Sequence, residues 1–204
     1  MTATCGEDGT VRTWDVRGKF DVVFPFLTYS LKVFYNFQRL GFISILLFFP
    51  DSRPQTSTIE PKKFANLSRP RLGSWLGDVS LHGDWIITGG GPKASIWHLK
   101  TMAPSVIPVL PEHCQSIFIT KFIPSDDRLI IGGQFIGGKM YHFNLNGDLM
   151  AEVKTTSSCL YSVEVTEQND FKLLSAGGAS SKIDLCCHNF SYNDNAITFP
   201  TMKN

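Results

Sequence analysis

The sequence predicts an all-β protein in which one four-stranded antiparallel unit is repeated, and three observations support this. Four segments share an apolar run, a turn of small residues and an alternating run: 2–15, 86–99, 129–143 and 173–186. Aligning them places Trp14, Trp97, Phe143 and Cys186 in one column. The last three are about 45 residues apart, the repeat length of propeller blades. No stretch keeps a helical period. We therefore expect a partial β-propeller: about three and a half four-stranded blades of a ring of about seven.

The bulk composition excludes several classes of protein. The chain has 204 residues, 43% of them hydrophobic, which is enough to bury a sizeable core. Its net charge of +1 leaves no electrostatic basis for unaided binding to nucleic acid or to an anionic membrane. Its five cysteines are an odd number with no signal peptide ahead of them, which predicts reduced thiols in the cytosol or nucleus.

Residues 1–19 are predicted to be the second half of a truncated blade. Asp8-Gly9 supplies a tight turn, and residues 10–14 alternate as a half-buried strand does. The first strand of such a blade would lie upstream of Met1, and a closed propeller needs about four blades or more. We therefore expect this chain to be a C-terminal fragment.

Residues 20–50 interrupt the repeat. They are rich in Phe, Leu and Val, where a hairpin loop has about two to five polar residues. A transmembrane helix is one explanation, but Lys32 and Arg39 break the apolar run. A functional loop is another, although it would expose an apolar patch. The explanation we favour is a translated intron, because residues 42–50 use amino acids with pyrimidine-rich codons and deleting the segment restores the spacing. Sequencing the transcript decides between them.

The remaining chain divides into two parts. Residues 51–72 are predicted to be an outer strand, 55–59, and a connector. Residues 73–204 are predicted to be three consecutive propeller blades. Their strands are expected at 74–80, 85–88, 94–99 and 106–110, then at 116–122, 127–131, 140–145 and 149–153, and finally at 160–165, 171–176, 182–186 and 196–199.

No group of residues predicts catalysis, a cofactor or a metal. His113-Cys114 lacks a third group to orient a thiol nucleophile, and we expect it in a loop. Asp126-Asp127 follows a proline at a predicted turn. The glycines at 89–91 and 137–138 lie between antiparallel strands, whereas a phosphate-binding loop opens a helix. The five histidines lack metal-ligand spacing.

The first hairpin resembles the end of a WD repeat, in the segment from Gly6 to Asp15. That resemblance implies a structural hydrogen-bond network made by Thr4, Asp8 and Trp14 with a histidine that would precede Met1. Thr88 and Trp97 occupy the matching positions in the next repeat. We expect all five residues to be structural and none to be catalytic.

From Leu67 onward the chain resembles the THO complex subunit 6 family more specifically. The matching phrases are Ser68-Arg69-Pro70, Trp75-Leu76-Gly77, Asp84-Trp85, Gly89-Gly90-Gly91-Pro92 and Trp97-His98-Leu99, with further matches at 145–149 and 175–178. Ile96 stands where that family tends to have leucine. The resemblance covers about 2–19 and 51–200 and lacks the family's N-terminal blades.

The resemblance implies a nuclear, non-enzymatic propeller subunit of the THO/TREX assembly, acting in mRNA processing, splicing and export. Its partners would be other THO/TREX subunits, with RNA contacted only through the complex. No membrane, cofactor or small-molecule substrate is implied, and the sequence assigns no partner-contact residue.

Three other functions remain open at this point. The first is a generic WD-repeat adaptor, such as a substrate receptor of a ubiquitin ligase, which would co-purify with a different complex. The second is an enzyme or a membrane protein, to be recognised by a convergent acid–base pair or by membrane fractionation that depends on residues 20–50. The third is a non-functional fragment, whose exposed apolar faces and unpaired edges would favour aggregation.

Overall fold

The computed structural model describes residues 1–15, 55–111, 114–123, 125, 127–135, 137–168, 171–187 and 195–199. Within these ranges the chain forms strands β1 to β15 and two 3-10 helices, and it forms no α-helix. The apolar segment 20–50, His113 and Asp126 lie outside the described residues. In the part of the chain that is described, no helix is long and apolar enough to cross a membrane.

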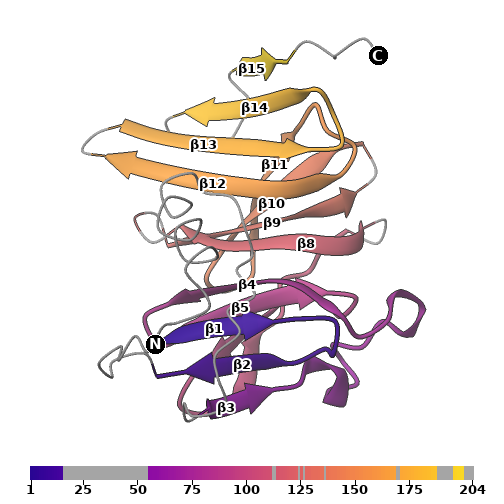
Figure 1. The fold of residues 1–204 in the computed structure, drawn as a ribbon, viewed down its shortest axis with the longest axis vertical. Helices are drawn as coiled ribbons and strands as arrows, with labels where there is room; N and C mark the ends of the chain where they lie inside the picture. Colours follow the sequence, from indigo (N-terminus) through magenta and orange to yellow (C-terminus); the bar gives the residue numbers. More distant parts are fainter. Residues whose placement is uncertain are drawn as a thin grey trace, which may run out of the picture.

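The strands form four antiparallel sheets that follow one another along the chain (Figure 1). The first contains β1 (Thr2–Cys5), β2 (Val11–Trp14) and β3 (Gln55–Ile59). The second contains β4 (Leu76–His82), β5 (Trp85–Gly90), β6 (Ser95–His98) and β7 (Ala103–Val106). The third contains β8 (Cys114–Ile123), β9 (Arg128–Phe135), β10 (Lys139–Asn144) and β11 (Leu149–Lys154). The fourth contains β12 (Leu160–Gln168), β13 (Phe171–Gly178), β14 (Lys182–Cys187) and β15 (Asn195–Thr198).

Each sheet is a simple meander, since every strand pairs with the strand that precedes it within the same sheet. The connector between the first two sheets carries the helices η1 (Pro61–Lys63) and η2 (Pro70–Leu72). Repeated four-stranded meanders stacked in chain order confirm the predicted all-β, partial WD-repeat propeller.

The first strands of consecutive sheets lie side by side, because β4 contacts β8 and β8 contacts β12. Polar contacts join them. The Thr120 N–H donates to Asp78 Oδ2 at 2.9 Å, and the Lys121 ammonium pairs with Glu164 at 3.1 Å. The joined residues are 42 and 43 positions apart. The period found in the sequence is therefore also the spatial period of the fold.

The hydrophobic core lies between the sheets rather than within one of them. One buried cluster joins the first and second sheets, another the second and third, and a third cluster the third and fourth. Trp97, Phe143 and Cys186 are fully buried, and each lies in the cluster that joins its own sheet to the preceding one. Three of the four aligned positions are thus equivalent core positions, whereas Trp14 is only half-buried.

The prediction for the outer strand of the second sheet was wrong. We expected residues 106–110, whereas β7 spans Ala103–Val106. The N–H groups of Thr101 and Met102 both donate to the His98 carbonyl, at 3.2 and 2.9 Å, and Met102 adopts a φ of 51°. This left-handed residue closes the turn directly after β6, so the outer strand begins earlier. Pro104 is tolerated because β7 is an edge strand.

Two smaller expectations also differ. Cys114 was expected in a loop, but it is the first residue of β8 and is buried. The strand expected at 140–145 ends one residue earlier, at Asn144, because the loop that follows it closes between Asn144 and Asp148. The Asn144 side chain accepts the N–H groups of Asn146 and Asp148, and this favours the longer loop.

Candidate protein-docking surface

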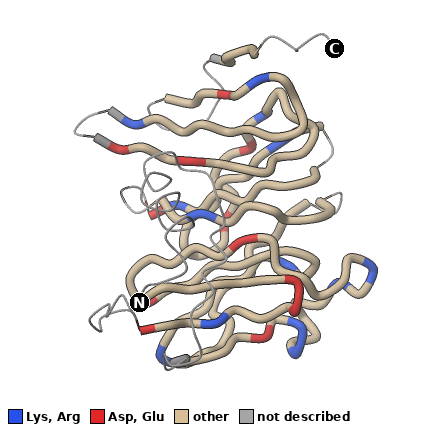
Figure 2. The backbone as a smooth tube through the Cα atoms, viewed as in Figure 1, with Lys and Arg blue, Asp and Glu red and all other residues tan. Residues whose placement is uncertain are grey.

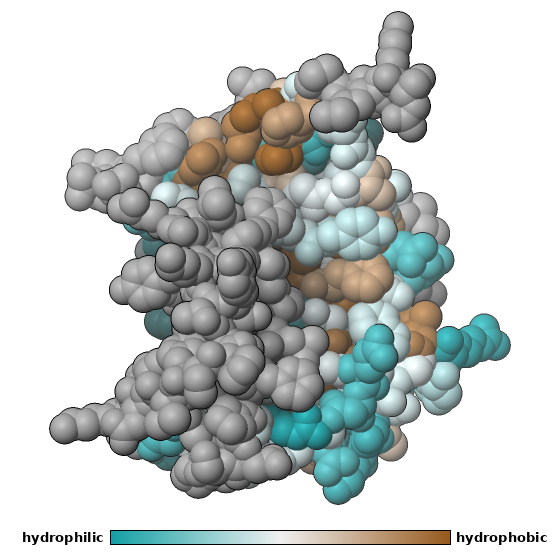
Figure 3. Space-filling model, viewed as in Figure 1, coloured by the Kyte–Doolittle hydropathy of each residue, from teal (hydrophilic) through white to brown (hydrophobic). Residues whose placement is uncertain are grey.

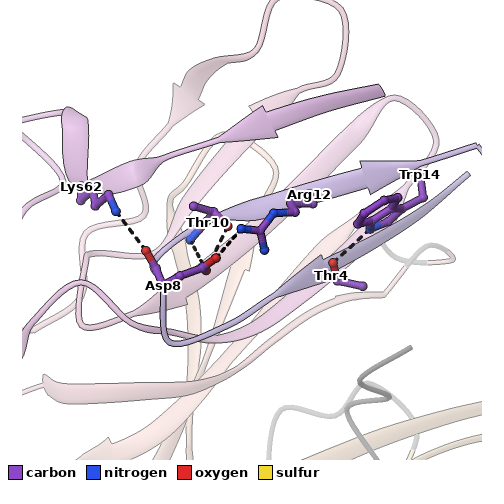
Figure 4. Close-up of polar contacts among 6 residues, drawn as sticks. All are labelled: Thr4, Asp8, Thr10, Arg12, Trp14 and Lys62. Atoms are coloured by element: carbon purple, nitrogen blue, oxygen red, sulfur yellow. Dashed lines mark hydrogen bonds and ion pairs between the residues drawn. The ribbon is translucent and has the colours of Figure 1, made fainter. Parts of the chain in front are cut away.

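The structure brings Thr4 and Trp14 together and leaves Asp8 apart from them (Figure 4). Thr2 pairs with Trp14 across the hairpin, so Thr4 lies on the same face of β1. The Trp14 Nε1–H donates to Thr4 Oγ1 at 3.1 Å. Asp8 instead accepts the Thr10 N–H at 3.1 Å, the Thr10 hydroxyl at 2.9 Å and the Arg12 guanidinium.

The electrostatics of Asp8 fit a residue that stabilises a turn. Slight burial acts to raise the pKa of Asp8, but the hydrogen bonds from Arg12 and Thr10 outweigh it and hold the pKa below its usual value. The Lys62 ammonium donates to the Asp8 carbonyl at 3.0 Å, which ties the turn to η1 (Figure 4). Asp8 is therefore ionised at neutral pH, and its charge is already partnered by Arg12.

Thr88 and Trp97 lie in the interior of the second sheet. The Thr88 hydroxyl donates to the Asp78 carbonyl at 2.9 Å, whereas the Trp97 Nε1–H donates to Ser95 Oγ at 2.9 Å. Both side chains are fully buried, and the Phe64 and Trp97 rings pack in a T-shaped arrangement. In both sheets the tryptophan N–H is thus satisfied by a nearby hydroxyl, which is a structural arrangement.

Arg69 connects two of the sequence phrases that carried the resemblance. Its guanidinium donates to the carbonyls of Gly91 at 2.7 Å, Gly90 at 2.8 Å and Pro92 at 3.1 Å. It also donates to the Cys114 carbonyl at 3.2 Å, which ties this glycine turn to the third sheet. Burial lowers the pKa of Arg69 from its usual value. The sequence contained both phrases, but nothing in it showed that they touch.

An aromatic row that was not predicted from the sequence crosses the first strands of three consecutive sheets. Trp75 immediately precedes β4, Phe118 lies in β8 and Tyr161 lies in β12. The Trp75 and Phe118 rings are stacked with centroids 5.4 Å apart, and the Phe118 and Tyr161 rings are 5.6 Å apart. Figure 3 shows a column of pale and apolar side chains over the starts of these strands. The signal available in the sequence was an aromatic residue recurring at the repeat spacing.

This row is partly accessible at the starts of the first strands. Tyr161 is 61% exposed, while Trp75 and Phe118 are half-buried. Beside Trp75 lies an open pocket of about 360 Å³, lined by Glu7, Ser74 and Trp75. Accessible aromatic side chains on a rigid sheet are suited to holding another chain.

A second, polar groove of about 280 Å³ lies farther along the same strands. Ser80, Lys121, Phe122, Glu164, Val165 and Glu167 line it. The Lys121–Glu164 ion pair occupies its wall, and the Ser80 hydroxyl accepts the Phe122 N–H at 3.3 Å. These groups join neighbouring sheets. Among the described residues, no three His, Cys, Asp or Glu side chains are grouped so as to hold a metal ion.

His142 is fully buried in β10, and neither of its ring nitrogens has a hydrogen-bond partner among the described residues. Burial, aided by the positive charge of Arg128, lowers the pKa of His142 to about 4. The ring is therefore neutral at physiological pH. Because no solvent reaches it, it is part of the core rather than a general base.

Comparison with known proteins agrees with this picture. No family model matches the chain. It is 30% identical over 191 residues to THO complex subunit 6 of Drosophila melanogaster, covering 94% of this chain and 51% of that protein. It is 28% identical over 197 residues to the Mus musculus homolog and 27% identical over 197 residues to the Homo sapiens protein, covering 95% of this chain and 46% of each. The chain spans about half the length of the curated relatives it matches. The resemblance carried by its sequence phrases is therefore confirmed: over nearly its whole length, this chain is homologous to THO complex subunit 6.

Proposed function

We propose that the chain acts as a non-enzymatic scaffold subunit of a THO/TREX-type assembly in the nucleus, where it supports mRNA processing, splicing and export by docking other proteins. The observation that carries the proposal is homology to THO complex subunits over nearly the whole chain. The proposed domain organisation is the one expected from the sequence, with three consecutive blades in residues 73–204.

The environments of three polar side chains support docking rather than catalysis. Asp78 binds the backbone of the neighbouring sheet, Arg69 binds four carbonyls, and His142 lies in the core. Each is occupied by a structural role, so none is available to a substrate. The accessible features are the aromatic row and its pocket, which are suited to a protein partner.

The charge distribution supports an indirect contact with RNA. The net charge is +1, and Figure 2 shows both signs spread along the described backbone rather than gathered in one basic stripe. Direct binding to a phosphate backbone draws on clustered Lys and Arg. We therefore propose that RNA reaches this subunit through its protein partners.

The test is affinity purification of the tagged chain from nuclear extract, with and without ribonuclease. The expected result is recovery of THO subunits that resists ribonuclease, because the contacts are between proteins. The tag fused to an unrelated propeller is the control. Recovery of ubiquitin-ligase components in place of THO subunits would contradict the proposal, as would recovery that ribonuclease abolishes.

A further inference from the structure

We propose that the pocket of Glu7, Ser74 and Trp75 binds an arginine side chain of a partner protein, whose chain continues along the aromatic row. This inference deepens the proposed docking function and rests on it for the existence of a protein partner. It assigns a ligand chemistry to one surface of the molecule.

The indole of Trp75 is held in place before any partner binds. Its Nε1–H donates to the Leu72 carbonyl at 2.8 Å, and its ring stacks on Phe118 at an interplanar angle of 26°. A ring fixed by a hydrogen bond and by stacking loses little freedom on binding, so the contact area that it offers a ligand costs little conformational entropy.

Glu7 lines the same pocket as Trp75, and backbone contacts fix the turn that carries it. The Leu76 N–H donates to the Gly6 carbonyl at 3.1 Å, which joins the β1–β2 turn to the start of β4. Gly9, with a φ of 74°, approaches Ser74 so closely that a Cβ there would lie 3.2 Å from the Ser74 carbonyl carbon. The turn that carries Glu7 is thus packed against the segment that carries Trp75.

The carboxylate of Glu7 differs from that of Asp8 in its partners. The neighbouring Asp8 is paired with Arg12, whereas the exposed Glu7 takes part in no ion pair or hydrogen bond among the described residues. A carboxylate next to an aromatic face attracts a cation in two ways, by its charge and by the ring quadrupole. This complementarity identifies the ligand as cationic.

Among cations, the guanidinium of arginine suits the site best. It is planar, so it can lie on an indole while donating two N–H groups to one carboxylate. Nucleic acid bases also stack on aromatic rows, but Glu7 would repel their phosphates. The pocket therefore favours a basic protein segment over RNA.

The experiment uses the full chain and a fluorescent peptide, Gly-Gly-Arg-Gly-Gly, with Lys and Gln replacing Arg in matched peptides and a uridine oligonucleotide as a separate probe. Fluorescence anisotropy gives the affinities. We expect the Arg peptide to bind about fivefold tighter than the Gln peptide, and Glu7→Gln to remove about that factor. Trp75→Leu should weaken binding at least as much. The controls are Asp84→Asn and Trp85→Leu, which change an exposed carboxylate and an exposed tryptophan just beyond the other end of β4.

Equal binding of the Arg and Gln peptides would overturn the inference, as would equal losses for Glu7→Gln and Asp84→Asn or preferred binding of the oligonucleotide. The two proposals can fail separately. If the chain recovers THO subunits but does not distinguish the peptides, the proposed function stands and the arginine pocket is wrong. A chain that binds the Arg peptide but recovers no THO subunit keeps the pocket and loses the proposed function.

Discussion

At the scale of single residues, the pKa values of two titratable groups, the buried His142 and the half-buried Asp78, shift in opposite directions. Burial lowers the pKa of His142 to about 4 from 6.5. Burial raises the pKa of Asp78 to about 6 from 3.8, although hydrogen bonds from the N–H groups of Thr120 and Val79 oppose the change. Between pH 4 and pH 6, His142 is neutral and Asp78 is protonated in the folded state, whereas His142 is protonated and Asp78 is ionised in the unfolded state. Their contributions to the pH dependence of stability therefore largely cancel in the wild-type chain.

Replacing His142 by leucine should remove the contribution of His142 to the pH dependence of stability. Because its folded pKa is depressed, the unfolded state takes up the proton first, and stability is lost as pH falls from about 6.5 towards 4. On going from pH 7.5 to pH 4, the free energy of unfolding of the His142→Leu variant should therefore rise by on the order of 3 kcal/mol relative to that of the wild type. Urea unfolding at the two pH values measures this. A stability difference that does not change with pH would show that His142 is not buried as described.

Replacing Asp78 by asparagine should have the opposite pH dependence. The folded pKa of Asp78 is raised, so its favourable contribution is fully present below about 3.8 and is lost as pH rises through about 6. Asparagine resembles the neutral acid and keeps an oxygen to accept the Thr120 N–H. On going from pH 4 to pH 7, the free energy of unfolding of Asp78→Asn should rise by about 2 kcal/mol relative to that of the wild type in the same assay. This is less than the full pKa shift implies, because the side chain is partly exposed. The exposed control Asp148→Asn should show no such gain.

The sequence predicted part of the residue-scale picture. The aligned column of Trp14, Trp97, Phe143 and Cys186 could be found from the sequence because it recurs with the repeat. The role of Arg69 was not, because its four carbonyl partners come from two other segments of the chain. The pairing of Glu7 with Trp75 was missed for the same reason, since it depends on how the first two sheets pack.

At the scale of strands, adjacent glycines in β13 give a matched test of inter-strand packing. A Cβ on Gly178 would overlap the backbone of Cys159 and Leu160, whereas a Cβ on Gly177 would meet only Cγ1 of Ile183, at 4.0 Å. Gly178→Ala should therefore destabilise the fold by about 3 kcal/mol or more, while Gly177→Ala should change stability by about 1 kcal/mol or less. Thermal unfolding of the two variants checks this. Equal losses would mean that the start of β12 does not lie against Gly178.

The strands themselves were predicted well where the local pattern decides them. The hairpin of β1 and β2, its pairing with β3 and most later strands follow from alternation and turn residues. The position of β7 was missed, because the left-handed Met102 is a residue type that rarely adopts such a conformation. The sequence gives no warning of a turn that short.

At the scale of the whole molecule, stability comes from sheets packed face to face at a regular spacing. The three core clusters each join two sheets, and polar contacts repeat 42 or 43 residues apart along the first strands. The period could be counted from the sequence, but the contacts between neighbouring sheets required the structure. The rings of the aromatic row recur at the same spacing and come together because neighbouring sheets stack. The proposed docking surface therefore exists only if the sheets stack in this order.

The most direct test of that claim is a nuclear Overhauser measurement between the rings of the aromatic row in the full chain. The structure predicts cross-peaks from Trp75 to Phe118 and from Phe118 to Tyr161, since the ring centroids are 5.4 and 5.6 Å apart. Cross-peaks between Thr2 and Trp14, which are paired within one sheet, provide the internal control. If the control peaks appear and both ring-to-ring peaks are absent, the sheets form without stacking, and the propeller, its core and its docking surface are contradicted together.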